Sequence, residues 1–236
     1  MTEEQKKKLG IKSTKNASEH GLKVLCFGAA GTGKTTMAGT LPGSTLILNV
    51  ENGALVLKDK DIDIIDIKKV SSEDPDEMTL LRAYQLIKDG TIKYDNVVLD
   101  SLTEISETLF TSLDTTMTKD EKDFGGLYVA FRSQMVQIIK AFRDLSNVNV
   151  IFIALEDMLD INGFQKMFPS TPHKKTSMNL AALFDEVLHI EVDANGIRSL
   201  RTTDSSQCVA KTRTGIEDGT KVLDFSKLYS TLTKGK

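Results

Sequence analysis

The sequence is short of cysteine, of long apolar runs and of charge of one sign, and each shortage excludes a class of protein. The two cysteines, Cys26 and Cys208, lie in apolar, strand-like runs and not at metal-ligand spacing. We interpret them as buried, reduced thiols, which indicates a reducing intracellular compartment. No segment approaches the roughly 18 apolar residues of a membrane span, and the amino-terminal MTEEQKKKLG lacks a signal-peptide core. We therefore expect a cytoplasmic protein without a membrane partner.

Charge and histidine content narrow the kinds of partner. The 30 Lys and Arg residues against 33 Asp and Glu residues give a formal net charge of −3, which argues against coating nucleic acid by bulk charge. Any contact with nucleic acid must therefore be local. His20 and His189 have no Cys or His at ligand spacing, so the sequence assigns neither of them a metal site.

The chain of 236 residues contains no Pro/Gly/Ser-rich linker, internal repeat or low-complexity segment. We therefore expect a single domain over residues 21–236. Residues 1–20 are polar, carry a basic triplet and show no apolar periodicity, so we expect a flexible tail there.

Apolar patterning predicts the fold class. Short apolar runs of the kind buried on both faces of a sheet occur at 22–27, 45–50, 96–100 and 147–155. Helical spacing occurs at 76–90, which ends at Gly90, and again between residues 127 and 145. Strands that alternate with helices predict an α/β fold with a mostly parallel central sheet and helices on both faces.

The carboxyl-terminal third has a different pattern. After the apolar run at 183–192 come two short runs, at 197–203 and 206–213, without a helix between them. We expect these runs to form an antiparallel hairpin extension at the edge of the sheet.

A phosphate-binding motif follows the first apolar run. GAAGTGKTT at 28–36 matches G-x-x-x-x-G-K-[ST] at every fixed position, after a strand and before a helix-forming segment. Its glycines let backbone amides point at phosphate oxygens, Lys34 would reach the outer phosphates, and the Thr35 hydroxyl would ligate Mg²⁺. The residues expected to bind ATP are Gly28, Ala29, Ala30, Gly31, Thr32, Gly33, Lys34, Thr35 and Thr36.

Carboxylates at strand ends complete such a site. Asp100 ends the run NVVLD, where it would hold hydrated Mg²⁺ at the end of a neighbouring strand. Residue 101 is Ser, so a general base adjacent to Asp100 is absent. Glu51 follows the run TLILNV and is our candidate for the catalytic base, because the carboxyl ends of parallel strands converge on the ligand. The alternative is that Glu51 is a helix-capping or surface carboxylate.

Three later segments carry a family resemblance. TLILNVENGALVL, YDNVVLDSLTEI and FRSQMVQIIKAFRDLSNVNVIFIAL follow one another as the corresponding segments do in RecA-like recombinase ATPases. Over about residues 21 to 215 the chain resembles the small, phage-encoded RecA-like proteins of the single-strand annealing class. That resemblance implies ATP and Mg²⁺ as cofactors and a catalytic glutamate at Glu51. It also implies that Lys211 and Arg213 of AKTRTG reach a neighbouring subunit's γ-phosphate.

The same resemblance implies partners and marks one departure. Its implied partners are single-stranded DNA, further copies of the chain in a ring or filament, and a single-strand DNA-binding protein, in the cytoplasm of a host cell. Members of the family commonly carry a Gln-type switch after the fourth strand, where this chain has Ala154 and Leu155 before Glu156. Glu156 is then the candidate for the switch.

The segment 157–178 stands in the position of the family's mobile DNA-binding loop. Basic residues there could contact phosphates and aromatic residues could stack on bases, as in sequence-tolerant single-strand binding. The candidates are Phe164, Lys166, Phe168, His173, Lys174 and Lys175. The alternative is a structural β-hairpin or lid whose Phe side chains pack on the domain. Residues 113–126 are acidic overall and are expected to form a solvated connection.

Three functions remain open at this point. The first is a Mg²⁺-dependent, DNA-stimulated ATPase that binds single-stranded DNA and promotes annealing or strand exchange in phage recombination or replication. The second is a nucleotide or small-molecule kinase, which the absence of Arg from 157–178 disfavours because a kinase lid needs Arg to clamp phosphates. The third is a nucleotide-gated adaptor or loader that acts through protein partners.

Overall fold

The computed structural model describes residues 1–11, 21–51, 53–221 and 224–228. Its strands are β1 (Lys23–Gly28), β2 (Thr45–Asn49), β3 (Asp63–Asp66), β4 (Asn96–Asp100), β5 (Asn149–Ile161), β6 (Phe164–Pro169), β7 (Glu186–Val192) and β8 (Arg198–Arg201). Its α-helices are α1 (Glu3–Lys8), α2 (Lys34–Ala38), α3 (Leu80–Lys88), α4 (Leu102–Thr116), α5 (Lys119–Lys122), α6 (Gly126–Arg143) and α7 (Lys174–Leu180). The structure also has three 3₁₀ turns, η2 (Ala54–Leu57), η3 (Asp123–Gly125) and η4 (Ala181–Leu183), and residues 225–228 are helical.

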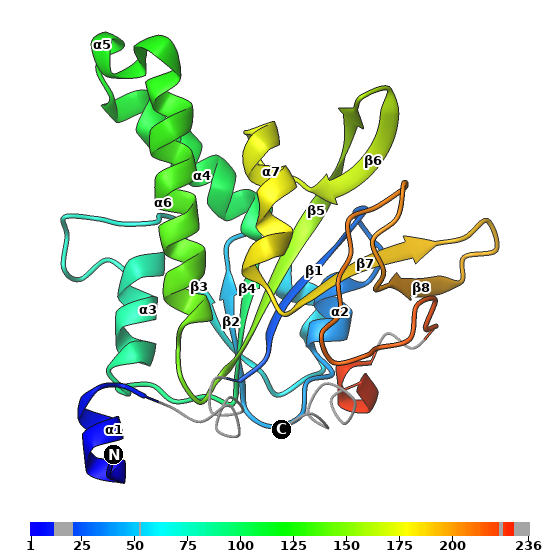
Figure 1. The fold of residues 1–236 in the computed structure, drawn as a ribbon, viewed down its shortest axis with the longest axis horizontal. Coiled ribbons are helices and arrows are strands. Elements are labelled where there is room, and N and C mark those ends of the chain that lie inside the picture. The colour runs from blue at the N-terminus through cyan, green and yellow to red at the C-terminus, as the bar shows by residue number, and fades with distance from the viewer. Residues whose placement is uncertain (12–20, 52, 222–223, 229–236) are drawn as a thin grey trace.

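One central sheet organises the chain (Figure 1). Its strand order is β3-β2-β4-β5-β1-β7-β8, and β6 pairs with the outer half of β5. The pairs from β3 through β7 are parallel, whereas β7–β8 and β5–β6 are antiparallel. The predicted α/β class, with a mostly parallel sheet and an antiparallel extension, is confirmed.

Successive residues of each central strand face opposite cores. Leu25 and Phe27 of β1 belong to the core that also includes residues of α3, α4 and α6, whereas Val24 and Cys26 belong to the core that includes residues of α2 and of the segment 224–228. The period of two follows from the pleat of a strand. Because each fully buried Leu, Ile or Phe side chain contributes about 1.5–3 kcal/mol, the two cores hold the sheet from both sides.

The register of the sheet brings distant segments to one edge. Gly28 at the end of β1 pairs with Leu155 of β5, and Asp100 at the end of β4 pairs with Ile153 of the same strand. β5 therefore lies between the strand of the phosphate-binding motif and the strand of Asp100. The expectation that these two strands are neighbours is wrong, although their carboxyl ends still meet at one edge.

Several elements differ from the expected ones. The run 206–213 is not a strand: it makes only isolated bridges, Cys208 with Met167 and Lys211 with Val187. The supposed connection at 113–126 contains the end of α4, all of α5 and η3. The segment 157–178 is the outer part of the β5–β6 hairpin followed by the start of α7.

The amino-terminal region is described in part. Residues Glu3–Lys8 form α1, an element that the sequence did not predict. The remainder of the expected tail, residues 12–20 with His20, lies outside the described residues. Across the part of the chain that the structure describes, no helix combines the length and apolarity needed to cross a membrane.

Candidate nucleotide-binding site

The phosphate-binding loop has backbone geometry that requires glycine. Gly33 has φ 97°, a left-handed conformation that other residues adopt at a steric cost, and it lies directly before α2. At Gly28, a Cβ atom would lie 2.7 Å from the carbonyl oxygen of Ile190 on β7. Gly28 and Gly33 therefore let the loop turn closely from β1 into α2.

Lys34 lies folded within this loop. Its Nζ donates hydrogen bonds to the carbonyl oxygens of Gly28 at 2.9 Å and Ala29 at 2.7 Å, and the side chain is buried. Burial lowers the pKa of Lys34, while negative charge on nearby groups, including Glu51 and Asp100, raises it in part. An ammonium held this way can exchange its carbonyl acceptors for phosphate oxygens without crossing solvent.

Thr35 and Asp100 meet across the loop. The Thr35 hydroxyl donates to Asp100 Oδ2 at 2.7 Å, and Asp100 is 3% exposed. Burial raises the pKa of Asp100, and the nearby Glu51 carboxylate adds to that rise, whereas the Thr35 hydrogen bond and Lys34 oppose it. A hydroxyl and a buried carboxylate are the hard oxygen donors that suit Mg²⁺, so this pair fits the ion.

A pocket of about 280 Å³ opens over the loop. Its walls combine the loop with the segment after β2, the end of β4 and a position within β5. The residues that line it include Gly31, Gly33, Lys34, Thr35, Thr36, Glu51, Asp100 and Leu155. The pocket thus gathers the loop lysine, the hydroxyl and both carboxylates expected from the sequence.

The sequence of residues 20–214 matches the AAA domain family. The chain belongs to this family. No curated protein is significantly similar to it in sequence.

Two solved structures are similar in fold to this AAA domain. A RadB recombinase aligns with 17% identity and a TM-score of 0.44, over 77% of this chain and 81% of the other. A prototypical ATPase from the type III secretion system of pathogenic bacteria aligns with 13% identity and a TM-score of 0.44, over 72% of this chain and 52% of the other. Together with the loop and the pocket over it, the family match makes the chain a P-loop ATPase domain of the AAA family.

Two further carboxylates of the AAA domain lie near the loop. Glu51 is exposed at the mouth of the 280 Å³ pocket, where a carboxylate can meet a water beside bound phosphate. Glu156 on β5 is partly buried, and its Oε2 lies 2.6 Å from His189 Nε2 on β7. The structure thus separates the two candidates: Glu51 faces the nucleotide pocket, and Glu156 has a histidine partner.

Lys211 and Arg213, which the resemblance implies act on a neighbouring subunit's nucleotide, lie away from the phosphate-binding loop of their own chain. Lys211 Nζ donates to the carbonyl oxygen of Ala181 at 3.0 Å, and Arg213 Nη1 lies 2.7 Å from Asp185 Oδ1. Arg213 also donates its backbone N–H to Glu186 at the start of β7, four residues before the level of the loop. At about 3.3 Å per strand residue this is about 13 Å along the strand, so neither cation serves the loop of its own chain.

The aromatic candidates for DNA contact differ sharply in exposure. Phe164 at the hairpin turn is 69% exposed, whereas Phe168 is 6% exposed and belongs to the larger hydrophobic core. Phe168 therefore cannot stack on bases in this conformation, and its assignment as a DNA contact is corrected to a packing role. The His173 ring contacts the Tyr128 ring, with centroids 5.1 Å apart.

The lysine candidates also differ. Lys166 is paired with Asp204 at 2.9 Å and lies over the Phe168 ring, so its charge is already engaged within the domain. Lys174 and Lys175 begin α7 and are exposed, and Lys174 donates to the carbonyl oxygen of Asp160 in the hairpin. The exposed cations of this segment are therefore at its end, beside the hairpin and not on it.

Arg198 is a site residue that the sequence did not predict. It lies on β8, its Nε donates to the Thr32 carbonyl oxygen at 2.9 Å, and its side chain passes next to Gly33. The separation of 166 residues leaves no local signal for this contact. Arg198 braces the outer side of the phosphate-binding loop.

Proposed function

We propose that this protein is a Mg²⁺-dependent, DNA-stimulated ATPase that binds single-stranded DNA and promotes annealing or strand exchange in phage DNA recombination or replication. ATP and Mg²⁺ would bind at Lys34, Thr35 and Asp100, with Glu51 as the base that orients the attacking water. The active form would be a ring or filament in which Lys211 or Arg213 reaches the next subunit's nucleotide, and a single-strand DNA-binding protein is a further expected partner.

The observation that carries this proposal is the continuity of β5. Leu155 lines the nucleotide pocket, Glu156 follows it, and the same strand runs on to Ile161 at the hairpin turn. A rigid element that contacts the nucleotide pocket at one position and solvent at another is what nucleotide-controlled binding requires. The hairpin is therefore the surface whose ligand can sense ATP.

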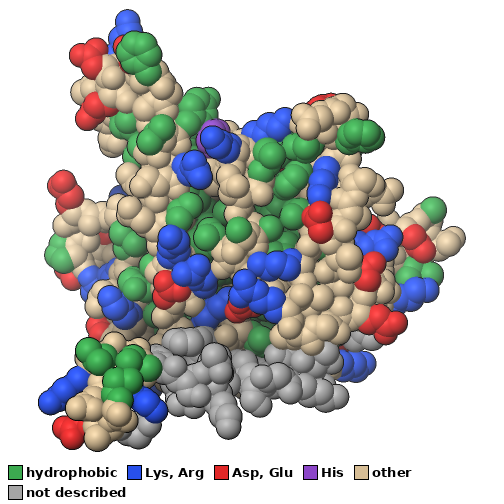
Figure 2. Space-filling model, viewed as in Figure 1, with side chains coloured by type: hydrophobic (Ala, Val, Ile, Leu, Met, Phe, Trp, Pro, Cys, Tyr) green, Lys and Arg blue, Asp and Glu red, His purple; other side chains and the backbone are tan. Residues whose placement is uncertain are grey.

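The face around the hairpin has the chemistry expected of single-strand binding. Exposed Phe164 lies at the turn, and exposed Lys174 and Lys175 lie where α7 begins. In the space-filling view, basic side chains gather with hydrophobic ones over α7 and the adjoining part of α6 (Figure 2). Aromatic stacking together with a few cations gives sequence-tolerant binding even when the net charge of the protein is negative.

The first test is ATP hydrolysis measured with and without Mg²⁺ and single-stranded DNA. We expect turnover to require Mg²⁺, to rise with DNA, and to be abolished in Lys34→Ala, because that variant lacks the ammonium beside the phosphates. Turnover that is indifferent to DNA would instead favour the kinase or the adaptor reading.

The DNA-binding surface is tested by a double variant with a matched control. Lys174→Ala with Lys175→Ala should weaken single-stranded DNA binding and reduce its salt dependence, while turnover without DNA is unchanged. Lys88→Ala with Lys93→Ala removes the same charge from exposed positions near the opposite edge of the sheet and should leave binding intact. Normal DNA binding by the first double variant would contradict the assignment of this surface.

A further inference from the structure

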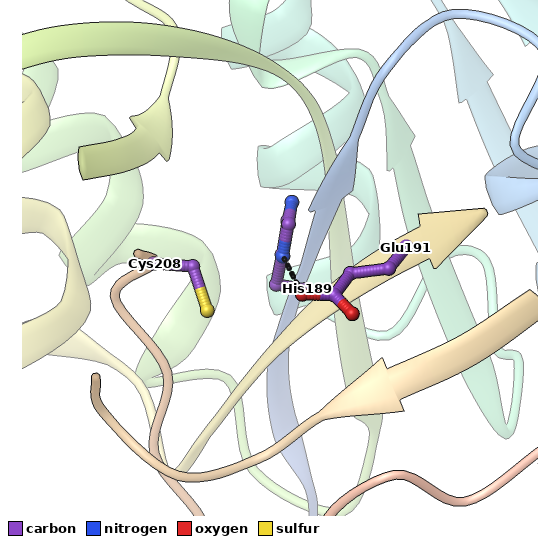
Figure 3. Close-up of side chains that lie close together, drawn as sticks. All are labelled: His189, Glu191 and Cys208. Carbon is purple, nitrogen blue, oxygen red and sulfur yellow. Dashed lines mark ion pairs between the residues drawn. The ribbon is translucent and has the colours of Figure 1, made fainter. Parts of the chain in front are cut away.

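A histidine, a glutamate and a cysteine from two segments meet beside β7. His189 and Glu191 are two residues apart on β7 and so share one face, and Cys208 arrives from the segment after β8 (Figure 3). One potential ligand atom from each residue lies within 4.8 Å of the other two. His189 and Cys208 are buried, and Glu191 is partly buried.

The hydrogen bonding of His189 leaves one ring nitrogen without a partner. Its Nε2 lies 2.6 Å from Glu156 Oε2, which accepts the Nε2–H proton and fixes that tautomer. Its Nδ1 is buried, has no hydrogen-bond partner among the described residues, and lies 3.9 Å from Glu191 Oε1. The Nδ1 lone pair and Glu191 Oε1 are then two electron-pair donors close to one another. A cation bound between them would satisfy both.

We propose that His189 Nδ1, Glu191 Oε1 and Cys208 Sγ bind a zinc ion, and that Glu156 orients His189 for it. Imidazole, carboxylate and thiolate are the donors zinc uses, and histidine ligands commonly donate their second N–H to a carboxylate, as His189 does to Glu156. Bond lengths of 2.0–2.3 Å place tetrahedral ligand atoms about 3.5 Å apart, so binding would draw these three atoms together by about 1 Å.

The surroundings are compatible with a bound cation. Arg201 Nε donates to Glu191 Oε2 at 2.8 Å, which leaves Oε1 available, and Asp218 offsets part of the Arg201 charge at 3.2 Å. Burial raises the pKa of the Cys208 thiol, so zinc would displace its proton to solvent on binding.

Solvent reaches the cluster through a second hollow. His189 and Glu191 line a pocket of about 730 Å³ whose wall also includes residues 29–32 of the phosphate-binding loop. This pocket gives the ion an access path and leaves room for a water as its fourth ligand. The site goes beyond the proposed ATPase function, since it uses none of the groups that hold ATP or Mg²⁺.

The decisive experiment is cobalt substitution of the full chain with excess Mg²⁺ present. Cobalt bound by Cys208 should give a thiolate-to-metal charge-transfer band, and zinc should abolish the band by competition at one equivalent per chain. Oxygen ligands at the Mg²⁺ site give no such band. Absence of the band in the wild-type protein, which needs no variant to be informative, would overturn the proposal.

Variants assign the ligands. His189→Gln keeps an N–H for Glu156 but has no second nitrogen, and Cys208→Ser replaces sulfur with oxygen. Each should abolish the band and lower zinc affinity by more than about 100-fold, while Glu156→Gln should lower it about 10- to 100-fold. Cys26→Ala removes the other cysteine and should keep the band. A band that survives Cys208→Ser, or disappears in folded Cys26→Ala, would refute the site.

Discussion

At the scale of single residues, the nucleotide site contains ionisable groups whose burial disfavours their charged forms. Asp100 and Lys34 are both nearly inaccessible to solvent, and burial shifts the pKa of each toward its neutral form. Such a site holds its charges at a cost to stability, and a ligand of complementary charge relieves that cost. Activity and stability should therefore respond in opposite directions to substitution here.

Asp100→Asn tests this opposition. The amide can still accept the Thr35 hydroxyl but loses the charge that attracts Mg²⁺, so turnover should fall about 10- to 100-fold. Because the folded-state pKa of Asp100 is raised above that of the unfolded chain, its ionised form costs stability at neutral pH. We expect Tm to rise at neutral pH by about 2–4 °C, the shift that about 1 kcal/mol produces at this chain length. The gain should shrink as pH falls toward the raised pKa.

Asp95, at the other end of the same strand, is the matched control. It accepts hydrogen bonds from Ser44, and those bonds lower its pKa. Asp95→Asn should therefore lower Tm at neutral pH and leave ATP turnover unchanged. The measurement is the Tm of both variants and of the wild type from neutral to acidic pH. A Tm of Asp100→Asn below that of the wild type at neutral pH would contradict the expectation.

At the scale of elements, the sequence motif and the apolar periodicity predicted many of the strands and helices but few of the contacts between them. The strands that carry Gly28 and Asp100 follow from their apolar runs, and α6 follows from its helical spacing. α4 was missed although Leu102, Ile105 and Leu109 have the same spacing, so its signal was present in the sequence.

Contacts across the sheet had no such signal. Glu156 with His189, and Arg198 with Thr32, depend on strand order, and nothing local in the sequence specifies which strands become neighbours. His189, which has no ligand partner nearby in the sequence, lies close to Cys208 and Glu191 for the same reason. The loop and Thr35 were predictable because the motif itself fixes their chemistry, and Asp100 was predictable because it ends an apolar run.

The β5–β6 hairpin offers a matched pair of phenylalanines on one strand. Phe168→Ala would leave a cavity in the core and should destabilise the protein by about 3–5 kcal/mol. Phe164→Ala changes an exposed side chain and should alter stability by less than about 0.5 kcal/mol. Its effect should instead be on single-stranded DNA binding, weakened by about 1–3 kcal/mol if one base stacks on the ring.

Denaturant unfolding and fluorescence-anisotropy titration with labelled DNA separate the two effects. The pair of results expected is a loss of stability for Phe168→Ala and a loss of DNA affinity for Phe164→Ala. Equal DNA affinity for Phe164→Ala and wild type would show that the hairpin tip does not stack on bases.

At the scale of the whole molecule, the positions of Lys211 and Arg213 bear on assembly. Both lie too far from their own chain's loop to act on its nucleotide, and Arg213 is exposed and forms an ion pair with Asp185. In the head-to-tail assembly that we propose, this surface would meet the loop of the next copy, since heterologous contacts generate rings and filaments.

Mixing two inactive variants tests that arrangement. Lys34→Ala lacks the loop lysine and Arg213→Ala lacks the proposed trans cation, so each should be inactive alone. In an equal mixture, about a quarter of the interfaces would combine an intact loop with an intact Arg213, and turnover should recover to about that fraction of wild type. Full activity of Arg213→Ala alone, or no recovery on mixing, would remove the trans role from Arg213.

The uninterrupted course of β5 also has a mechanical consequence. From Leu155 at the nucleotide pocket to Ile161 at the turn, six residues at about 3.4 Å each make a lever arm of about 20 Å. A tilt of about 10° at the pocket end would move the far end by about 3.5 Å over that length. Because β6 braces the arm along its side, a displacement too small to disturb the sheet at Leu155 becomes large enough at the tip to make or break a contact.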